Sequence, residues 1–479
     1  MPVVAFLIFV AVVVWAIALA RFKVPGADQL SKLSPLHLGG VMVLIVGSVF
    51  GYEFFHISGG PIPITLDRLL LGCLVVLAGW AWLMNKENMR RPNGMDVSVF
   101  GVIGILCLST FIHDFGFAKN LPLSRFLFFY CLPLALYLIV RTAKLNSLDL
   151  AAITTALGAL AVYLAITGIA EVKNFHAIVF PRYIVESTIT EFFGRGRGPF
   201  LNPVSNGVFQ IAGFCCIWFW WPKGSRRVRM LVVVSSLLVA VGVYATLTRS
   251  VWMALILVVG VGFWVTTSRQ QKGILIVLGT LAAIVLIPAV GDKVFSFKRD
   301  KNVTLAQMSK SAQLRPLFLT VALRMFEDRP LFGCGFGQYA REKTPYLQDS
   351  TSSQPLRQTK VYLQHNVFLA YLTEMGLAGL FVLLIMLGVM ARSAWLLWIN
   401  RKQTLEQRQF GLLLAAMLVC FCVNGMFHDT SIMPMMNYLL FFVAGIVNNI
   451  RTAPTAVVET VATTAPTRPL PARGFPATN

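Results

Sequence analysis

Charge is scarce in this sequence. Of its 479 residues only 13% are charged and 57% are hydrophobic, and the mean hydropathy is +0.72. Soluble globular proteins carry about 25% charged residues, so the charges here are too few to cover a water-facing surface. Apolar runs of roughly 20 residues recur along the chain, and each is long enough to cross a bilayer as a helix. The sequence therefore predicts an all-α polytopic membrane protein.

Cysteine patterns for metal or disulfide chemistry are also missing. The eight cysteines form no CxxC pair and no Cys/His spacing typical of zinc, and all except Cys334 fall in apolar runs. We interpret them as small hydrophobic residues that pack between helices. No metal site and no cofactor are expected.

Acidic residues are few as well: 20 Asp and Glu stand against 41 Lys and Arg, for a formal net charge of +21. No two acidic residues stand out at the outer face of the membrane, so the paired-carboxylate chemistry of glycoside hydrolysis is poorly supported. The positive excess does not indicate nucleic-acid binding, because much of it lies in the short connections that orient membrane helices. No soluble domain is present to hold a duplex.

Lys and Arg collect in alternate short connections, such as KENMRR (86–91) and KGSRRVR (223–229). The positive-inside rule makes these connections cytoplasmic, which places the N-terminus outside and the C-terminus inside. The first apolar run lacks the positively charged leader of a signal peptide, so we interpret it as a retained helix. We expect about 12 or 13 transmembrane helices, near residues 1–20, 36–56, 64–85, 98–117, 122–140, 150–171, 200–221, 230–247, 250–267, 273–290, 362–391, 409–427 and 433–450.

This topology divides the chain into five parts. Residues 291–361 form one large loop on the outer side of the membrane, and the tail 451–479, rich in Thr, Ala and Pro, is expected to be disordered in the cytoplasm. The other parts are N-terminal transmembrane helices over 1–172, transmembrane helices with Arg-bearing outer connections over 173–290, and C-terminal transmembrane helices over 362–450.

One arginine, Arg249, lies in the otherwise apolar stretch VGVYATLTRSVWMALILVVG (241–260). Residues 230–267 are too long for one span, so TLTRS is expected to form a tight outer hairpin, with the second helix beginning near Ser250 or Val251. A charge at the bilayer centre costs about 3 kcal/mol, and the hairpin removes most of that cost. A guanidinium is shaped for bidentate phosphate binding. The structural alternative is a side chain that only snorkels to the surface.

A second basic cluster precedes a predicted span. The stretch FFGRGRGPFLNPVSNG (192–207) holds Arg195 and Arg197 between glycines, followed by Asn202. Glycine lets the backbone approach a ligand closely, so the two arginines can flank a diphosphate. The alternative is a flexible turn beside the membrane.

Within the large outer loop, residues from 311 onwards show a helical pattern. We expect Pro316 in the first turn and the helix along the membrane surface, with Arg315 and Arg324 off its apolar stripe and towards the headgroups. The segment RPLFGCGFGQY (329–339) does not match GxGxxG and follows no strand, so it predicts a tight turn and not a dinucleotide site. The apolar stripe consists of Leu314, Leu317, Phe318, Val321, Ala322 and Met325.

Polar residues also stand where the chain re-enters the membrane after the loop. A neutral His365 can accept a proton from a hydroxyl there, and Asn366 follows it. Alternatively, His365 is only a capping or interfacial residue. Glu374 lies deeper and points away from His365, so we expect it to pair with an arginine or to pack against a neighbouring helix. In the last outer hairpin, Asp429 either orients a cation or caps the final helix.

Four motifs follow one another around the long outer loop: RGRGPFLNPVSNG, LTRSVWMALI, DRPLFGCGFGQY and QHNVFLAYLTEMGLAGL. Together they resemble the O-antigen ligase-related (Wzy_C) family of membrane glycan ligases and polymerases, over roughly residues 195–390. The first six spans are supported by topology alone. The resemblance implies a metal-independent, inverting glycosyltransferase of the GT-C type, which moves a glycan from undecaprenyl pyrophosphate to an acceptor hydroxyl. It also implies the inner membrane of a bacterium, with the active site facing the periplasm.

The resemblance gives roles to residues already singled out. Arg249 and Arg197 match pyrophosphate binders, with Arg195 an alternative to Arg197. His365 matches a histidine that activates or orients the acceptor. Arg315 resembles the arginine that opens the loop helix, although Arg-Pro at this point departs from many relatives. Supporting roles fall to Asn202, Arg324, Asn366, Glu374 and Asp429.

The motifs do not name the acceptor, which is a lipid A core hydroxyl in a ligase, a second lipid-linked glycan in a polymerase, or a protein Ser or Thr. The competing interpretation is a lipid-linked glycan flippase or another polysaccharide transporter. Transporters typically show internal repeats and polar sites in the middle of the membrane. No clear repeat relates the two halves of this sequence, and the candidate residues gather at one face, which favours an enzyme.

Overall fold

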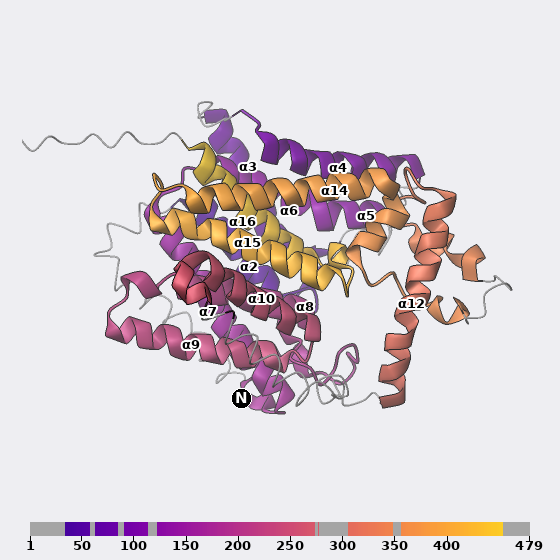
Figure 1. Ribbon diagram of the computed structural model, residues 1–479, viewed down its shortest axis with the longest axis horizontal. Helices are drawn as coiled ribbons and strands as arrows, with labels where there is room; N and C mark the ends of the chain where they lie inside the picture. The colour runs from indigo at the N-terminus through magenta and orange to yellow at the C-terminus, as the bar shows by residue number, and fades with distance from the viewer. Residues whose placement is uncertain are drawn as a thin grey trace, which may run out of the picture.

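The computed structural model describes residues 34–57, 63–84, 91–113, 122–273, 276, 305–347 and 356–453. These residues are mostly helical, and the long helices lie side by side in one bundle (Figure 1). One helix, α12 (Leu305–Asp328), runs across the others at one end, which we call the α12 end. In the described ranges the strands are limited to one antiparallel pair, β1 (His56–Ile57) with β2 (Ile64–Thr65). The predicted all-α class is confirmed.

Eight helices of the described chain are long and apolar enough to cross a membrane, and they coincide with eight of the predicted spans. They are α3 (Leu66–Met84), α4 (Gly94–His113), the continuous segment Pro122–Thr142 made of α5 (Pro122–Phe126), η3 (Leu127–Cys131) and α6 (Leu132–Thr142), α7 (Ser147–Val172), α9 (Arg226–Ala245), α10 (Arg249–Thr266), α14 (Val367–Ile399) and α15 (Leu405–Gly425).

The other predicted spans differ from expectation or lie outside the described residues. Those near 36–56, 200–221 and 433–450 hold α2 (Pro35–Val49), α8 (Pro203–Trp218) and α16 (Pro434–Thr452), which are shorter or less apolar than the eight. The predicted spans 1–20 and 273–290 are not among the described residues, apart from positions 273 and 276. Short helices occupy the connections: η4 (His176–Ile178), η5 (Arg182–Val185), η6 (Gly198–Phe200), η7 (Trp221–Lys223), α13 (Tyr339–Glu342), η8 (Thr344–Leu347), η9 (Leu356–Thr359) and η10 (Thr430–Ile432).

The centre of the bundle is formed by α7, α8, α15 and α16, whose side chains are mostly buried. Helices α7 and α8 approach closely because Gly213 has no side chain: a Cβ there would lie 2.2 Å from the Ala161 Cβ and 2.4 Å from the Leu157 carbonyl oxygen. Small residues let membrane helices pack by direct van der Waals contact. The eight cysteines, all within the described ranges, are free thiols, and seven of them lie in helices as predicted.

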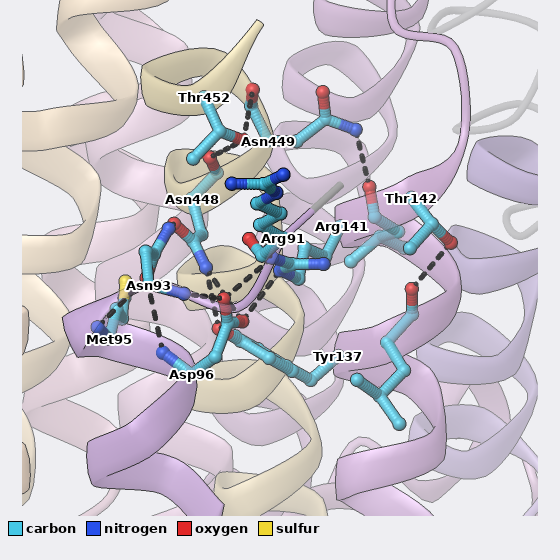
Figure 2. Close-up of polar contacts among 12 residues, drawn as sticks. Arg91, Asn93, Met95, Asp96, Tyr137, Arg141, Thr142, Asn448, Asn449 and Thr452 are labelled. Atoms are coloured by element: carbon cyan, nitrogen blue, oxygen red, sulfur yellow. Dashed lines mark hydrogen bonds and ion pairs between the residues drawn. The ribbon is translucent and has the colours of Figure 1, made fainter. Parts of the chain in front are cut away.

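A buried polar network ties α4, α6 and α16 together (Figure 2). The Asp96 carboxylate accepts hydrogen bonds from the Tyr137 hydroxyl at 2.7 Å, the Asn448 amide at 2.9 Å and the Arg141 guanidinium at 2.6 Å. A buried ion pair is tolerated when further hydrogen bonds satisfy its remaining atoms. The backbone N–H of Asn93 supplies another such bond, at 2.8 Å.

This network lies at the end of α4 that is remote from α12. Ser109 of α4 accepts a hydrogen bond at 2.9 Å from the N–H of Phe336, in the segment that follows α12. Thirteen residues separate Asp96 from Ser109, which is about 20 Å of helix. The Asp96 network therefore holds one end of α4, and the segment that follows α12 contacts the other end.

Candidate functional site

The predicted hairpin is present, and Arg249 is the first residue of α10. Residues 246–248 form a three-residue turn after α9, in which Leu247 has a left-handed φ of 49°. Across the turn, the Trp252 indole N–H donates to the Val243 carbonyl at 3.2 Å. A helix N-terminus carries the positive end of the macrodipole. Because Arg249 adds a full positive charge there, the turn favours an anionic ligand.

Residues from distant parts of the chain join Arg249. Burial, and then the charge of Arg249, lower the pKa of the Arg315 guanidinium in α12. The pKa of His365 is lowered by partial desolvation, then by the charges of Arg315 and Lys343. All the charges that shift these two groups are positive. We call Arg249, Arg315, Lys343 and His365 the Arg249 cluster.

His365 is held in an unusual backbone conformation next to aromatic rings. Its φ is 51°, and a non-glycine residue in this region carries strain of about 1–3 kcal/mol, which is a feature of functional sites. The imidazole centroid lies 5.4 Å from that of Phe318 and 6.1 Å from that of Tyr362. His365 as a whole is nevertheless an exposed residue. The imidazole therefore contacts aromatic rings of the loop while the residue stays accessible.

The start of α14 is attached to the connection between α15 and α16. Asn366 caps α14 by accepting from two N–H groups of its first turn, and its amide donates to the Met426 carbonyl at 3.2 Å. The next ring, Phe427, lies 5.1 Å from the Arg315 guanidinium, a cation–π contact. Asp429 accepts from the Ser431 N–H at 3.1 Å, so it caps η10 and not the final helix α16. Burial raises the pKa of Asp429.

The apolar stripe predicted in the loop helix is confirmed, because all six of its residues are buried in α12. The helix begins earlier than expected, at Leu305, so Pro316 lies inside it and not in its first turn. The stripe packs against Cys334, Tyr339 and Leu356 of the same loop. Protein therefore covers this face, whereas a helix lying in the membrane surface would turn it towards lipid. The small core of the loop positions Arg315 beside His365.

The segment 330–337 docks onto a break in α14. At Gly376 the helix backbone has φ 65°, and a Cβ there would lie 2.4 Å from the Leu331 carbonyl oxygen, so only glycine fits. Four backbone hydrogen bonds of 2.8 to 3.1 Å join the segment to residues 373–378 across the break. The Glu374 carboxylate adds another, accepting from the Gly337 N–H at 2.8 Å. Glu374 was expected to pair with an arginine or to pack against a neighbouring helix; its carboxylate is bonded to the backbone of the loop, and Arg125 is the arginine whose charge acts on it.

The two glycine-flanked arginines lie against the end of α9, beside the Arg249 turn. The Gly196 N–H donates to the Ala245 carbonyl at 2.8 Å. Arg197 is fully buried, with its Nε 3.1 Å from the Glu171 carboxylate and its terminal nitrogens donating to three backbone carbonyls of residues 184–191. Glu171 also accepts from the Gly198 N–H at 2.9 Å. The Arg197 guanidinium thus holds its own loop in place.

Replacing Arg197 with Met is expected to destabilise the protein. The change leaves the Glu171 carboxylate buried without its cation, and removing one partner of a buried ion pair costs about 3–5 kcal/mol. The melting temperature in detergent should fall, and the double variant with Glu171→Leu should recover part of the loss because no unpaired charge remains. If Arg197→Met melts like wild type but no longer binds the donor, Arg197 is a ligand-binding residue after all.

The structure also places the other three predicted residues, Asn202, Arg195 and Arg324. Asn202 caps α8, accepting from the N–H groups of residues 204 and 205 at 2.9 and 3.2 Å. Arg195 is buried, with its guanidinium 5.2 Å from the Phe192 ring. Arg324 follows Arg315 by nine residues, which is about 13.5 Å along α12 and half a turn around it. Arg324 is therefore directed away from Arg315.

Sequence reasoning missed Lys343, Glu171 and Phe427. Lys343 is buried, and its ammonium donates to the carbonyls of Thr359, at 3.1 Å, and Tyr362, just before His365. Burial lowers the pKa of Lys343 to about 8. A signal existed for Glu171, an acid at the outer end of a predicted span, but none marks the other two. Among the described residues no three His, Cys, Asp or Glu side chains form a metal-binding group.

Residues 234–384 match the protein-family model Wzy_C, described as O-antigen ligase. The match agrees with the resemblance that the four motifs indicated, and it connects residues 234–384 with O-antigen ligases. It begins in α9, ends in α14 and includes the whole Arg249 cluster. The arginines at 195 and 197 lie before the matched segment, although the resemblance was expected to start there. No curated protein matches the chain.

Proposed function

We propose that the protein transfers a glycan from undecaprenyl pyrophosphate to the hydroxyl group of an acceptor. The observation that supports this most is the meeting of Arg249, Arg315 and His365, which puts two guanidinium groups and one imidazole together at a helix N-terminus. All three belong to the segment that matches the O-antigen ligase family. The α12 end then faces the periplasm from the inner membrane of a bacterium, on a GT-C-like scaffold.

In the proposed step, the acceptor oxygen attacks C1 of the first sugar and forms the new glycosidic bond. The bond from C1 to the phosphate oxygen breaks, and the lipid pyrophosphate leaves with the electron pair. One direct displacement inverts the configuration at C1. Arg249 and Arg315 stabilise the negative charge that develops on the leaving group. Two arginines can provide the positive charge that a metal ion provides in other phosphate chemistry, so the transfer is metal-independent.

His365 takes the proton from the acceptor hydroxyl in this mechanism. A general base must be neutral when the substrate arrives, and the lowered pKa of His365 keeps the imidazole neutral at pH 7. Arg197, Asn366 and Glu374 act indirectly. Asn366 and Glu374 hold a helix start and a loop that carry residues of the cluster, and Arg197 holds the loop that is bonded beside the Arg249 turn. Arg195 remains a candidate for contact with the pyrophosphate, since Gly196 is bonded beside the Arg249 turn.

The acceptor decides the subclass. A hydroxyl of the lipid A core makes the protein a ligase, and a hydroxyl of a second lipid-linked glycan makes it a polymerase. Both are alcohols that need the same base and the same stabilised leaving group.

Purified protein in reconstituted membranes tests this function. A glycan on undecaprenyl pyrophosphate is supplied with lipid A core, a second lipid-linked glycan or a Ser/Thr peptide, each with and without EDTA. We expect one acceptor to gain the glycan at a rate that EDTA leaves unchanged. Transfer that stops in EDTA contradicts the metal-independent step. Movement of the lipid-linked glycan across the bilayer, with no transfer by folded protein, indicates a transporter.

A further inference from the structure

A separate cavity of about 340 Å³ lies at the junction of α2, α3, α8 and α16. Its volume falls in the range of about 300–1,000 Å³ that small-molecule sites occupy. Arg249 and Arg315, proposed above to stabilise the leaving group, and His365, the proposed base, do not line it. Among the predicted site residues only Asn202 does.

Two buried hydroxyl groups in the wall of this cavity lack a protein partner. Thr65 and Tyr438 are each only 2% exposed, and neither hydroxyl has a hydrogen-bond partner among the described residues. An unsatisfied buried polar group costs about 1–3 kcal/mol, so native proteins rarely keep one without a reason. A ligand that offers hydrogen bonds inside the cavity would satisfy both.

The other lining groups favour a neutral ligand with many hydroxyls. Asp67 and Glu53 provide two carboxylates against one guanidinium, that of Arg68, which lies 3.8 Å from the Phe128 ring and donates to the Pro63 carbonyl. The resulting net negative charge disfavours phosphate, while carboxylates accept hydrogen bonds from hydroxyls strongly. Phe128 and other aromatic residues offer apolar faces to the C–H groups of a sugar ring.

Short stretches of chain connect the cavity with Arg197 and with Phe427. Asn202 lines the cavity and follows Arg197 by five residues; Ile432 lines it and follows Phe427 by five. Five residues of chain span at most about 18 Å. Phe427 itself contacts Arg315.

We propose that this cavity is a glycan subsite that binds a neutral, hydroxyl-rich sugar unit through Thr65, Asp67 and Tyr438. Its place in catalysis rests on the proposed function, since the bound sugar would belong to the glycan being transferred or extended. Its binding chemistry does not, because sugar binding can be measured without any transfer.

The test is saturation-transfer NMR on the full chain in detergent, with glucose, galactose, rhamnose and N-acetylglucosamine as probes and inorganic pyrophosphate as competitor. We expect at least one sugar to bind, and pyrophosphate not to displace it. Tyr438→Phe removes one hydroxyl and should weaken binding about two- to tenfold, and Asp67→Asn at least about tenfold. Tyr339→Phe is the matched control, because the Tyr339 hydroxyl is also buried without a partner in the described chain but lies outside the cavity.

Three results overturn the subsite: no sugar binds, pyrophosphate displaces the sugar, or Tyr438→Phe binds sugar as tightly as Tyr339→Phe. Melting temperatures of all variants show that each is folded. Arg249→Ala separates the two proposals, since it should lose transfer and keep sugar binding. If wild type binds sugar at this cavity but transfers nothing, the proposed function fails and the subsite stands. If transfer occurs but the cavity variants bind sugar normally, the subsite fails alone.

Discussion

Arg249→Ala is expected to lower kcat for glycan transfer by about 100- to 1,000-fold, because removing one donor to a developing oxyanion has this effect in other enzymes. Arg249 begins α10, so its charge and the helix N-terminus act on the same leaving group. The measurement is the initial rate of undecaprenyl pyrophosphate release in reconstituted membranes at saturating donor. The protein should still insert and fold, which its melting temperature in detergent checks.

Two other variants show whether the loss is specific. Arg249→Lys keeps the charge but not the bidentate fork, so it should retain more activity than Arg249→Ala and less than wild type. Arg329→Ala is the matched control: this exposed arginine lies in the same part of the protein, 3.3 Å from Glu342, and an exposed ion pair contributes little. Transfer by Arg249→Ala at a near-normal rate would remove Arg249 from the pyrophosphate site.

His365→Ala should reduce transfer by about 100- to 10,000-fold, the usual contribution of a general base. The wild-type rate should also fall as the pH drops through the pKa of His365, because the protonated imidazole cannot accept a proton. That pKa is lowered by partial desolvation and by the charges of Arg315 and Lys343, so activity should persist below the pH at which an ordinary histidine becomes protonated. Rates measured from pH 4.5 to 8 give the pH–rate profile, and its acidic limb is the fall in rate at low pH.

Lys343 offers an independent check of the base. Its own pKa is lowered to about 8, so Lys343 is charged throughout the acidic range and opposes protonation of His365 there. Lys343→Met removes that charge and should move the acidic limb to higher pH, whereas Lys343→Arg should leave it in place. An acidic limb that is the same in all three proteins, or that persists in His365→Ala, would mean that another group is the base.

Features set by neighbouring residues were predictable from the sequence. The TLTRS turn follows from the length of the apolar run around it, and the stripe of α12 follows from helical periodicity. The start of α12 was missed because the apolar pattern used for the prediction begins only near residue 311, so Pro316 was misplaced. Helices α8 and α16 begin at prolines, Pro203 and Pro434, and the predicted span near 200–221 began too early because that break was ignored.

Pairings between distant segments were not predictable in the same way. A charge pattern indicated that Arg195 and Arg197 could face a diphosphate, but it could not show that Glu171, 26 residues before Arg197, is its partner. Likewise, the glycines of 333–337 indicated a turn, and only the three-dimensional arrangement shows that they lie against α14. Hydropathy identifies helices, whereas the ion pairs between them depend on which helix faces lie together.

The break at Gly376 also constrains the order in which the protein can be assembled. Residues 330–335 leave the ribosome before residues 373–378, since synthesis proceeds from the N-terminus. Their backbone hydrogen bonds to α14 therefore cannot form until α14 has been made and placed in the bundle. The loop that carries Arg315 therefore reaches its final position only after a helix that follows it in the sequence, so an incompletely inserted chain lacks the assembled form of the proposed catalytic centre.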